Sequence, residues 1–174
     1  MMVPLGRFNI ILGLLILLTP GCKTTEEKEK SKEATFLRFH LETNPMGPRH
    51  TTTATVYRQN PVMLNIERDA VLDEGFMAKA EVVPADQFGS FAIKITFDST
   101  GTRRLDYITS SNKGGRFVIN CRWTETRFLA APLITHHIKN GIFVFTPDAS
   151  REEAERIVVG LNNVIAKLKK PYTF

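Results

Sequence analysis

The residues best suited to chemistry in this chain of 174 residues are two cysteines and four histidines. A thiolate is a nucleophile and a metal ligand, and an imidazole can act as a general base or a ligand. Their spacing favours neither use, because the sequence has no Cys-x-x-Cys and no His-Glu-x-x-His. The adjacent His136 and His137 would point to opposite faces of a strand. We therefore expect no catalytic residue, metal or cofactor, and predict that the protein is not an enzyme.

Other chemical signatures are also missing from the sequence. It has no Gly-x-Ser-x-Gly elbow and no phosphate-binding glycine loop, so we expect no small-molecule substrate. The net charge is +5, without the concentrated basic stripe and interleaved aromatic residues of nucleic-acid binders, so we expect no nucleic acid partner. Arg103, Arg104, Arg116 and Arg122 are candidates for a shared basic surface near the first helix, although scattered solubility charges explain them more simply.

Cys22 stands directly after a leader-like segment. The apolar run from Ile10 to Leu18 has the length of a secretory hydrophobic region and falls short of the roughly 18 residues that would span a bilayer. Pro20 and Gly21 then end any helix and expose the backbone to a peptidase. Residues 1–21 are therefore predicted to be a cleaved signal peptide.

The residues around Cys22 resemble a bacterial lipobox, in which a small residue precedes a cysteine that is lipidated before cleavage. Gly21 and Cys22 match this motif, whereas Thr19 departs from its usual leucine. The resemblance implies a diacylglyceryl group on the Cys22 sulfur and an acyl chain on the new N-terminus, so that the lipid bilayer is a partner. In the known signal for retention in the inner membrane, an aspartate follows the cysteine. This chain has Lys23 there, so we expect the protein at the outer membrane, facing the periplasm. An ordinary signal peptide with a coincidental cysteine is the alternative.

The next segment is predicted to be a tether. From Lys23 to Glu33 the chain carries lysines and glutamates with no apolar residue, so it cannot bury surface to offset its ordering entropy. The predicted organisation is therefore a signal peptide in residues 1–21, a lipidated disordered tether in 22–35, a strand-rich part in 36–90, an α+β part in 91–170 and a tail in 171–174.

Alternating apolar and polar residues predict most strands of the folded part. The predicted strands 128–131 and 142–145 show less alternation of apolar and polar residues, and the segment 133–138 is a further candidate strand. Cys121 alternates with Phe117, Ile119 and Trp123, so it is expected to be a small buried apolar side chain rather than a reactive thiol. The expected strands are Phe36–Leu41, Thr52–Tyr57, Val62–Ile66, Met77–Val83, Phe91–Phe97, Arg116–Trp123, Phe128–Ala131, Leu133–Ile138 and Ile142–Phe145.

Two helices are predicted from capping signals and helical spacing. The first begins after Asp98 and ends near Asn112 and Gly114. The second begins with a capping box formed by Ser150 and Glu153. Its expected apolar stripe comprises Ala154, Ile157, Val158, Leu161, Ile165 and Leu168. The order of elements predicts an α+β domain in which two helices pack on one face of a mostly antiparallel sheet.

The segment from Phe91 to Lys169 resembles the head of the large periplasmic domain of SecD, a subunit of the bacterial protein-export machinery. The similarity lies in the strand that ends in Phe97-Asp98, the later Ala131-Pro132-Leu133-Ile134, and Phe145-Thr146 before the last helix. Residues from about Phe36 resemble the strands that precede this head more loosely. The positions that match the family's pattern, each with a structural reason of its own, are Asp98, Gly101, Asn112, Gly114, Pro132 and Gly141.

This resemblance implies a SecD-head-like module that contacts translocating chains and carries no catalytic residue. SecD itself couples the proton gradient to export through transmembrane helices. We do not infer proton-driven activity for this chain. The hypothesis is a membrane-anchored envelope lipoprotein with a non-catalytic binding module for exported polypeptides or an envelope protein complex. The alternative is a structural or assembly lipoprotein with no link to protein export.

Overall fold

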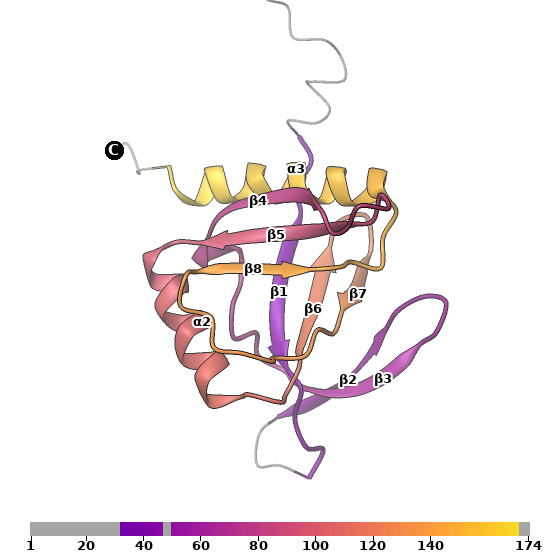
Figure 1. Ribbon diagram of the computed structural model, residues 1–174, viewed down its shortest axis with the longest axis vertical. Helices are drawn as coiled ribbons and strands as arrows, with labels where there is room; N and C mark the ends of the chain where they lie inside the picture. Colours follow the sequence, from indigo (N-terminus) through magenta and orange to yellow (C-terminus); the bar gives the residue numbers. More distant parts are fainter. Residues whose placement is uncertain (1–31, 47–49, 171–174) are drawn as a thin grey trace, which may run out of the picture.

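The computed structural model describes residues 32–46 and 50–170 and forms an α+β domain (Figure 1). The predicted fold class, with two helices and mostly antiparallel strands, is confirmed. The predicted signal peptide, Cys22, most of the predicted tether and the predicted tail lie outside the described residues. The elements in chain order are β1 (Phe36–Leu41), β2 (Thr51–Val56), β3 (Val62–Glu67), η1 (Glu74–Phe76), β4 (Met77–Pro84), β5 (Phe91–Phe97), α2 (Ser99–Ser111), β6 (Phe117–Arg122), β7 (Thr126–Ala130), β8 (Ile142–Phe145) and α3 (Arg151–Leu168).

The strands form two sheets. A five-stranded sheet has the order β1-β6-β7-β2-β3, and all its pairs are antiparallel except β2 with β7. A bridge between Glu42 and Ile66 brings the chain after β1 next to β3. The second sheet has three antiparallel strands in the order β4-β5-β8. Both helices bury apolar residues in the cluster formed by the inner face of this second sheet, and the five-stranded sheet contributes to the same core.

Phe39 of β1 lies at the centre of the core between the sheets. Its ring makes edge-to-face contacts with Phe117 of the same sheet and with Phe97 and Phe143 of the other, at centroid separations of 5.7, 5.9 and 5.4 Å. Such pairs contribute about 0.5–1.5 kcal/mol each beyond the burial of their area. These contacts therefore join β1, β5, β6 and β8 into one core.

The helix α2 begins and ends where the sequence predicts. The carboxylate of Asp98 accepts hydrogen bonds from the backbone N–H groups of Thr100 and Gly101 at 3.0 and 2.8 Å. Gly101 allows close packing, because a Cβ atom there would lie 2.4 Å from the backbone oxygen of Phe76. Asn112 is the C-cap, and Gly114 follows with a φ of +89°, a conformation that favours glycine.

The helix α3 runs along β4 (Figure 1). Its predicted capping box is present: the Ser150 hydroxyl accepts from the N–H of Glu153, and the Glu153 carboxylate accepts from the N–H of Ser150. Ile157, Leu161 and Ile165 are buried in the core, as expected. Leu168 is an exception to the predicted stripe, because it is 57% exposed at the end of the helix.

The end of the expected tether packs against α3. Thr35 is fully buried beside Gly160, and Glu33 accepts hydrogen bonds from the Arg156 guanidinium. The side chain of Asn163 also donates to the backbone oxygen of Glu33 at 3.1 Å. The folded part therefore includes Glu33 to Thr35.

The predicted strand at Leu133–Ile138 is wrong. Only an isolated bridge between Arg116 and Leu133 forms there. Instead, Ile134 exchanges backbone hydrogen bonds with the Gly114–Gly115 turn, and the N–H of Ile138 donates to the hydroxyl of Thr109 at 3.0 Å. The backbone groups that a strand would use are thus engaged by α2 and the turn that follows it.

Candidate functional site

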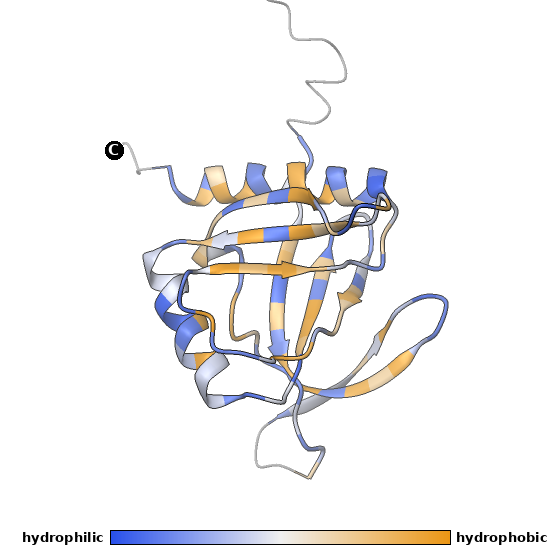
Figure 2. Ribbon diagram, viewed as in Figure 1, coloured by the Kyte–Doolittle hydropathy of each residue, from blue (hydrophilic) through white to orange (hydrophobic). Residues whose placement is uncertain are grey.

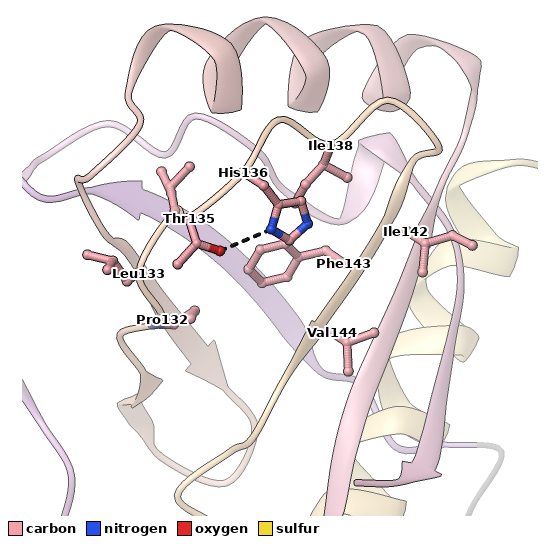
Figure 3. Close-up of a pocket in the computed structure, with 9 residues that line it drawn as sticks. Pro132, Leu133, Thr135, His136, Ile138, Ile142, Phe143 and Val144 are labelled. Carbon is pink, nitrogen blue, oxygen red and sulfur yellow. Dashed lines mark hydrogen bonds between the residues drawn. The ribbon is translucent and has the colours of Figure 1, made fainter.

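A groove beside β8 is the candidate functional site (Figure 3). We call it the edge groove; its volume is about 290 Å³. In Figure 3, Leu133 and Thr135 lie on one side of the hollow, Ile142 and Val144 lie on the other, and Phe143 lies between them. Its lining residues are mostly apolar and comprise Pro132, Leu133, Ile134, Thr135, His136, Ile138, Ile142, Phe143 and Val144.

One wall of the edge groove is held by α2. The buried hydroxyl of Thr109 accepts the N–H of Ile138, and the imidazole of His137 contacts the carboxylate of Asp106. Gly141, at a φ of +68°, packs so closely on Thr102 that a Cβ atom would lie 2.1 Å from the Thr102 hydroxyl. These contacts fix the segment between β7 and β8, so the groove is preformed.

The other wall is the edge strand β8. Phe143 and Phe145 point into the core, whereas Ile142 and Val144 point outward and are 39% and 49% exposed. Figure 2 shows that β8 is apolar along its whole length, its outward-facing positions included. Isolated surface-exposed apolar residues are common, but two on one short edge strand beside an apolar groove mark a candidate interaction surface.

The hydrogen bonding of β8 leaves its outer edge open. Phe97 donates to the backbone oxygen of Gly141, so this is a hydrogen-bonded pair of the β5–β8 ladder. Because such pairs alternate in antiparallel sheets, the backbone groups of Phe143 turn toward β5 and those of Ile142 and Val144 turn away. The N–H of Ile142 is taken by the Asn140 side chain at 3.1 Å. Within the described part of the chain, β8 pairs only with β5.

The opposite edge of the same sheet is covered. Asn162 of α3 uses its side-chain oxygen to accept from the N–H of Ala80 on β4 and its side-chain nitrogen to donate to the Ala80 oxygen, each at 2.9 Å. An amide side chain thus satisfies the outward backbone groups of Ala80, and α3 runs along this strand (Figure 1). Of the two edges of this sheet, β8 is the one available to a partner.

The four histidines and Cys121 lie within the described residues, whereas Cys22 lies outside them. In residues 32–46 and 50–170, no three His, Cys, Asp or Glu side chains are arranged to hold a metal ion. Cys121 is buried on β6, as its place in the strand predicts, and burial raises the pKa of its thiol to about 12. The thiol is therefore protonated at neutral pH and packs as an apolar side chain. Burial likewise lowers the pKa of His40.

Three carboxylates, those of Asp98, Asp148 and Glu153, are engaged in contacts within the fold. Asp98 caps α2 and also accepts from the Lys169 ammonium at 3.0 Å. Asp148 and Glu153 form ion pairs with Arg58, at 3.5 and 3.1 Å. The backbone N–H of Ser150 is the main cause that lowers the pKa of Glu153, and the nearby Arg58 adds to it.

Most of the matched family positions lie at the ends of α2 or at the turn into β8. Asp98, Gly101, Asn112 and Gly114 begin and end α2, and Gly141 starts the turn into β8. Of the six, only Pro132 lines the edge groove. Cys22, the expected lipidation site, lies outside the described residues.

Sequence reasoning did not bring together the groove residues Leu133, His136, Ile142 and Val144. The sequence did indicate that Ile142 and Val144 are unusual, because the strand Ile142–Phe145 is apolar at every position. A strand with one face in the core and the other in water would normally alternate.

These features define a small α+β domain with two sheets packed around one core, in which the three-stranded sheet has an open edge at β8. The chain belongs to the family described as SecDF, P1 head subdomain. The model of this family matches residues 51–164, which is more than half of the chain. The resemblance noted from the sequence is thereby confirmed, and it extends upstream of Phe91.

The solved structures that are similar to this chain include two of SecDF. One is of a membrane component SecDF that enhances protein export, with a TM-score of 0.56, 20% identity, and coverage of 83% of this chain and 71% of that chain. The other is SecDF in a super-membrane-facing form, with a TM-score of 0.58, 20% identity, and coverage of 81% and 21%. At this identity the similarity shows the fold alone, and the chain spans about a fifth of the second protein. No curated protein matches at a significant level.

Membrane spanning can be assessed for the described residues only. Of the helices in residues 32–46 and 50–170, none combines the length and the apolar character needed to cross a membrane.

Proposed function

We propose that this protein is a non-catalytic polypeptide-binding head of the bacterial cell envelope with a role in protein export. The observation that carries the proposal is the open edge of β8 beside the apolar edge groove. Membership of the SecDF P1 head family supports the link to export, because one similar structure is of a SecDF that enhances protein export.

The binding mode that fits the site is strand addition. An extended polypeptide can hydrogen-bond to the outward carbonyl of Ile142 and to the outward N–H and carbonyl of Val144, and its alternate side chains then contact the groove. The backbone supplies affinity without regard to sequence, while the apolar lining selects segments with apolar side chains. Such recognition suits chains that are exported unfolded and that share no common motif.

The expected interaction is brief. The strand β8 has 4 residues, so an added segment matches only about 13 Å of edge. The mostly apolar groove, with His136 as its only ionisable lining residue, gives little electrostatic anchoring. We expect weak, transient binding, which allows a translocating chain to be released and bound again.

We further propose that Cys22 anchors this head to the membrane through lipid. The support is the apolar run from Ile10 to Leu18 followed directly by Gly21 and Cys22. The variant Cys22→Ala should lose fatty-acid labelling and move to the soluble fraction of lysed cells, because alanine has no sulfur to carry the diacylglyceryl group. Continued labelling and membrane retention of the variant would show that the lipid is not on Cys22.

Site-specific photocrosslinking in intact cells tests the polypeptide-binding role. A photoreactive residue placed at Val144 or Leu133, which are 49% and 48% exposed, should yield adducts with many different exported precursors. The same probe at Met63 on β3, which is 73% exposed and outside the groove, is the matched control and should yield few.

The pattern of adducts decides between the two candidate functions. A single fixed neighbour captured from the groove would favour the structural or assembly role and contradict the export role. Equal capture from Val144 and Met63 would mean that the groove has no special part in binding.

A further inference from the structure

A second hollow lies on the far side of α2 from the edge groove. We call it the arginine groove; its volume is about 630 Å³. It lies between the exposed side of α2, the end of β1 and the loop before η1. Its lining residues are Leu41, Val71, Thr100, Arg103, Arg104, Tyr107, Ile108, Ser111 and Asn112.

The lining combines an apolar floor with a polar rim. Leu41 and Ile108 belong to the buried core, and Val71 packs against it. Tyr107, 72% exposed, stands on the rim one helical turn beyond Arg103 and Arg104. Tyrosine and arginine are among the side chains enriched at protein interfaces, and here they stand above an apolar floor.

The charge of this groove is of one sign. No carboxylate lines it, and neither Arg103 nor Arg104 takes part in the ion pairs found among the described residues. Arg103 donates to the Thr100 hydroxyl at 3.3 Å, and Arg104 lies 4.9 Å from the centre of the Phe76 ring. Asp106, the one carboxylate on α2, turns to the other side and contacts His137. Both guanidinium groups can therefore receive an anionic partner.

The remaining arginines considered with these two lie elsewhere. Arg116 pairs with Glu42 at 3.7 Å, and Arg122 stacks on Phe36 at 4.4 Å. The four do not form one basic surface. Only Arg103 and Arg104 share a concave site.

We propose that the arginine groove docks an acidic, amphipathic segment of a partner protein. Carboxylate side chains of the segment accept paired hydrogen bonds from the Arg103 and Arg104 forks, and its apolar side chains cover Leu41, Val71 and Ile108. A protein segment fits better than a lipid surface, because the apolar area lies at the bottom of a hollow rather than on a protruding tip. This site is independent of the edge groove, since α2 separates them and they share no lining residue.

A random-peptide library screened on the purified full chain in detergent tests the proposal. The enriched peptides should carry two acidic residues three or four positions apart, flanked by apolar ones. Their affinity should fall at least about tenfold for the double variant Arg103→Glu with Arg104→Glu. The control with the same change in net charge, Arg38→Glu with Arg151→Glu, should bind as the unmodified chain does.

A charge-swap experiment separates docking from loss of structure. The double variant should keep the melting temperature within a few degrees and should bind peptides whose acidic residues are replaced by lysine. Absence of any enriched acidic motif, or equal binding by the double variant, would overturn the proposal. Binding of short-chain phosphatidylglycerol that is lost in the double variant, without an enriched peptide, would overturn it in favour of a lipid ligand.

Discussion

Asn162 of α3 hydrogen-bonds to both backbone groups of Ala80 on β4, at 2.9 Å each. Ala80 is 1% exposed, so replacing Asn162 with alanine would leave a buried N–H and a buried C=O without partners. We expect a loss of about 1–3 kcal/mol in the free energy of unfolding for each group. Urea unfolding of a chain that begins at Lys32 measures this loss.

The control for Asn162 is Asn60→Ala, at an exposed turn, which should change the free energy of unfolding by about 0.5 kcal/mol or less. Equal effects would mean that Asn162 does not close this edge.

The core position of α3 can be tested at two leucines. Leu161 is fully buried, and its replacement by alanine should lower the free energy of unfolding by about 2–5 kcal/mol. Leu168 is 57% exposed, so the same replacement there should cost about 0.5 kcal/mol or less. Denaturant titration of both variants gives the comparison. A small loss at Leu161 would contradict the placement of α3 against the core.

The contact between Gly160 and Thr35 predicts a non-additive pair of substitutions. Alanine in place of a helical glycine usually gains about 0.5–1 kcal/mol. Here its Cβ atom would lie 2.4 Å from the Thr35 hydroxyl, so Gly160→Ala should instead destabilise by about 1–3 kcal/mol.

A double-mutant cycle is the check on this contact. In a Thr35→Ala background the cost of Gly160→Ala should shrink by at least about 1 kcal/mol, because the hydroxyl is gone. Additive effects would show that the residues before β1 do not pack on α3.

The sequence alone located the helices and strands that are specified by residues close together in the chain. Asp98 and the Ser150–Glu153 capping box mark the starts of the helices because capping depends on residues within one turn. Alternation likewise located β5 and β6. The strand expected at Leu133–Ile138 failed because the partners of its backbone groups, Thr109 and the Gly114–Gly115 turn, are distant in sequence.

The candidate site depended on long-range pairing and was therefore not visible in the sequence. Ile142 and Val144 face a groove only because β8 lies at the edge of a sheet, and strand order is not encoded in the apolar pattern of one strand. The division into two sheets is hidden for the same reason. Leu168 fits the helical stripe by spacing, yet it lies beyond the end of the core.

The central claim is that an extended polypeptide pairs with β8, and proline substitution at Val144 tests it most directly. The N–H of Val144 points away from β5, so Val144→Pro should preserve the ladder and the fold, as prolines on open edges do. The matched variant Phe143→Pro removes an N–H that faces β5 and should unfold the domain. Val144→Ala retains the backbone donor and serves as the control for the side chain.

The deciding measurement is the affinity of these variants for a fluorescent peptide of alternating valine and threonine, followed by fluorescence anisotropy. The account predicts that Val144→Pro keeps the melting curve of the unmodified chain and binds at least about tenfold more weakly, while Val144→Ala loses less. Unchanged binding by a folded Val144→Pro variant would contradict strand addition at β8.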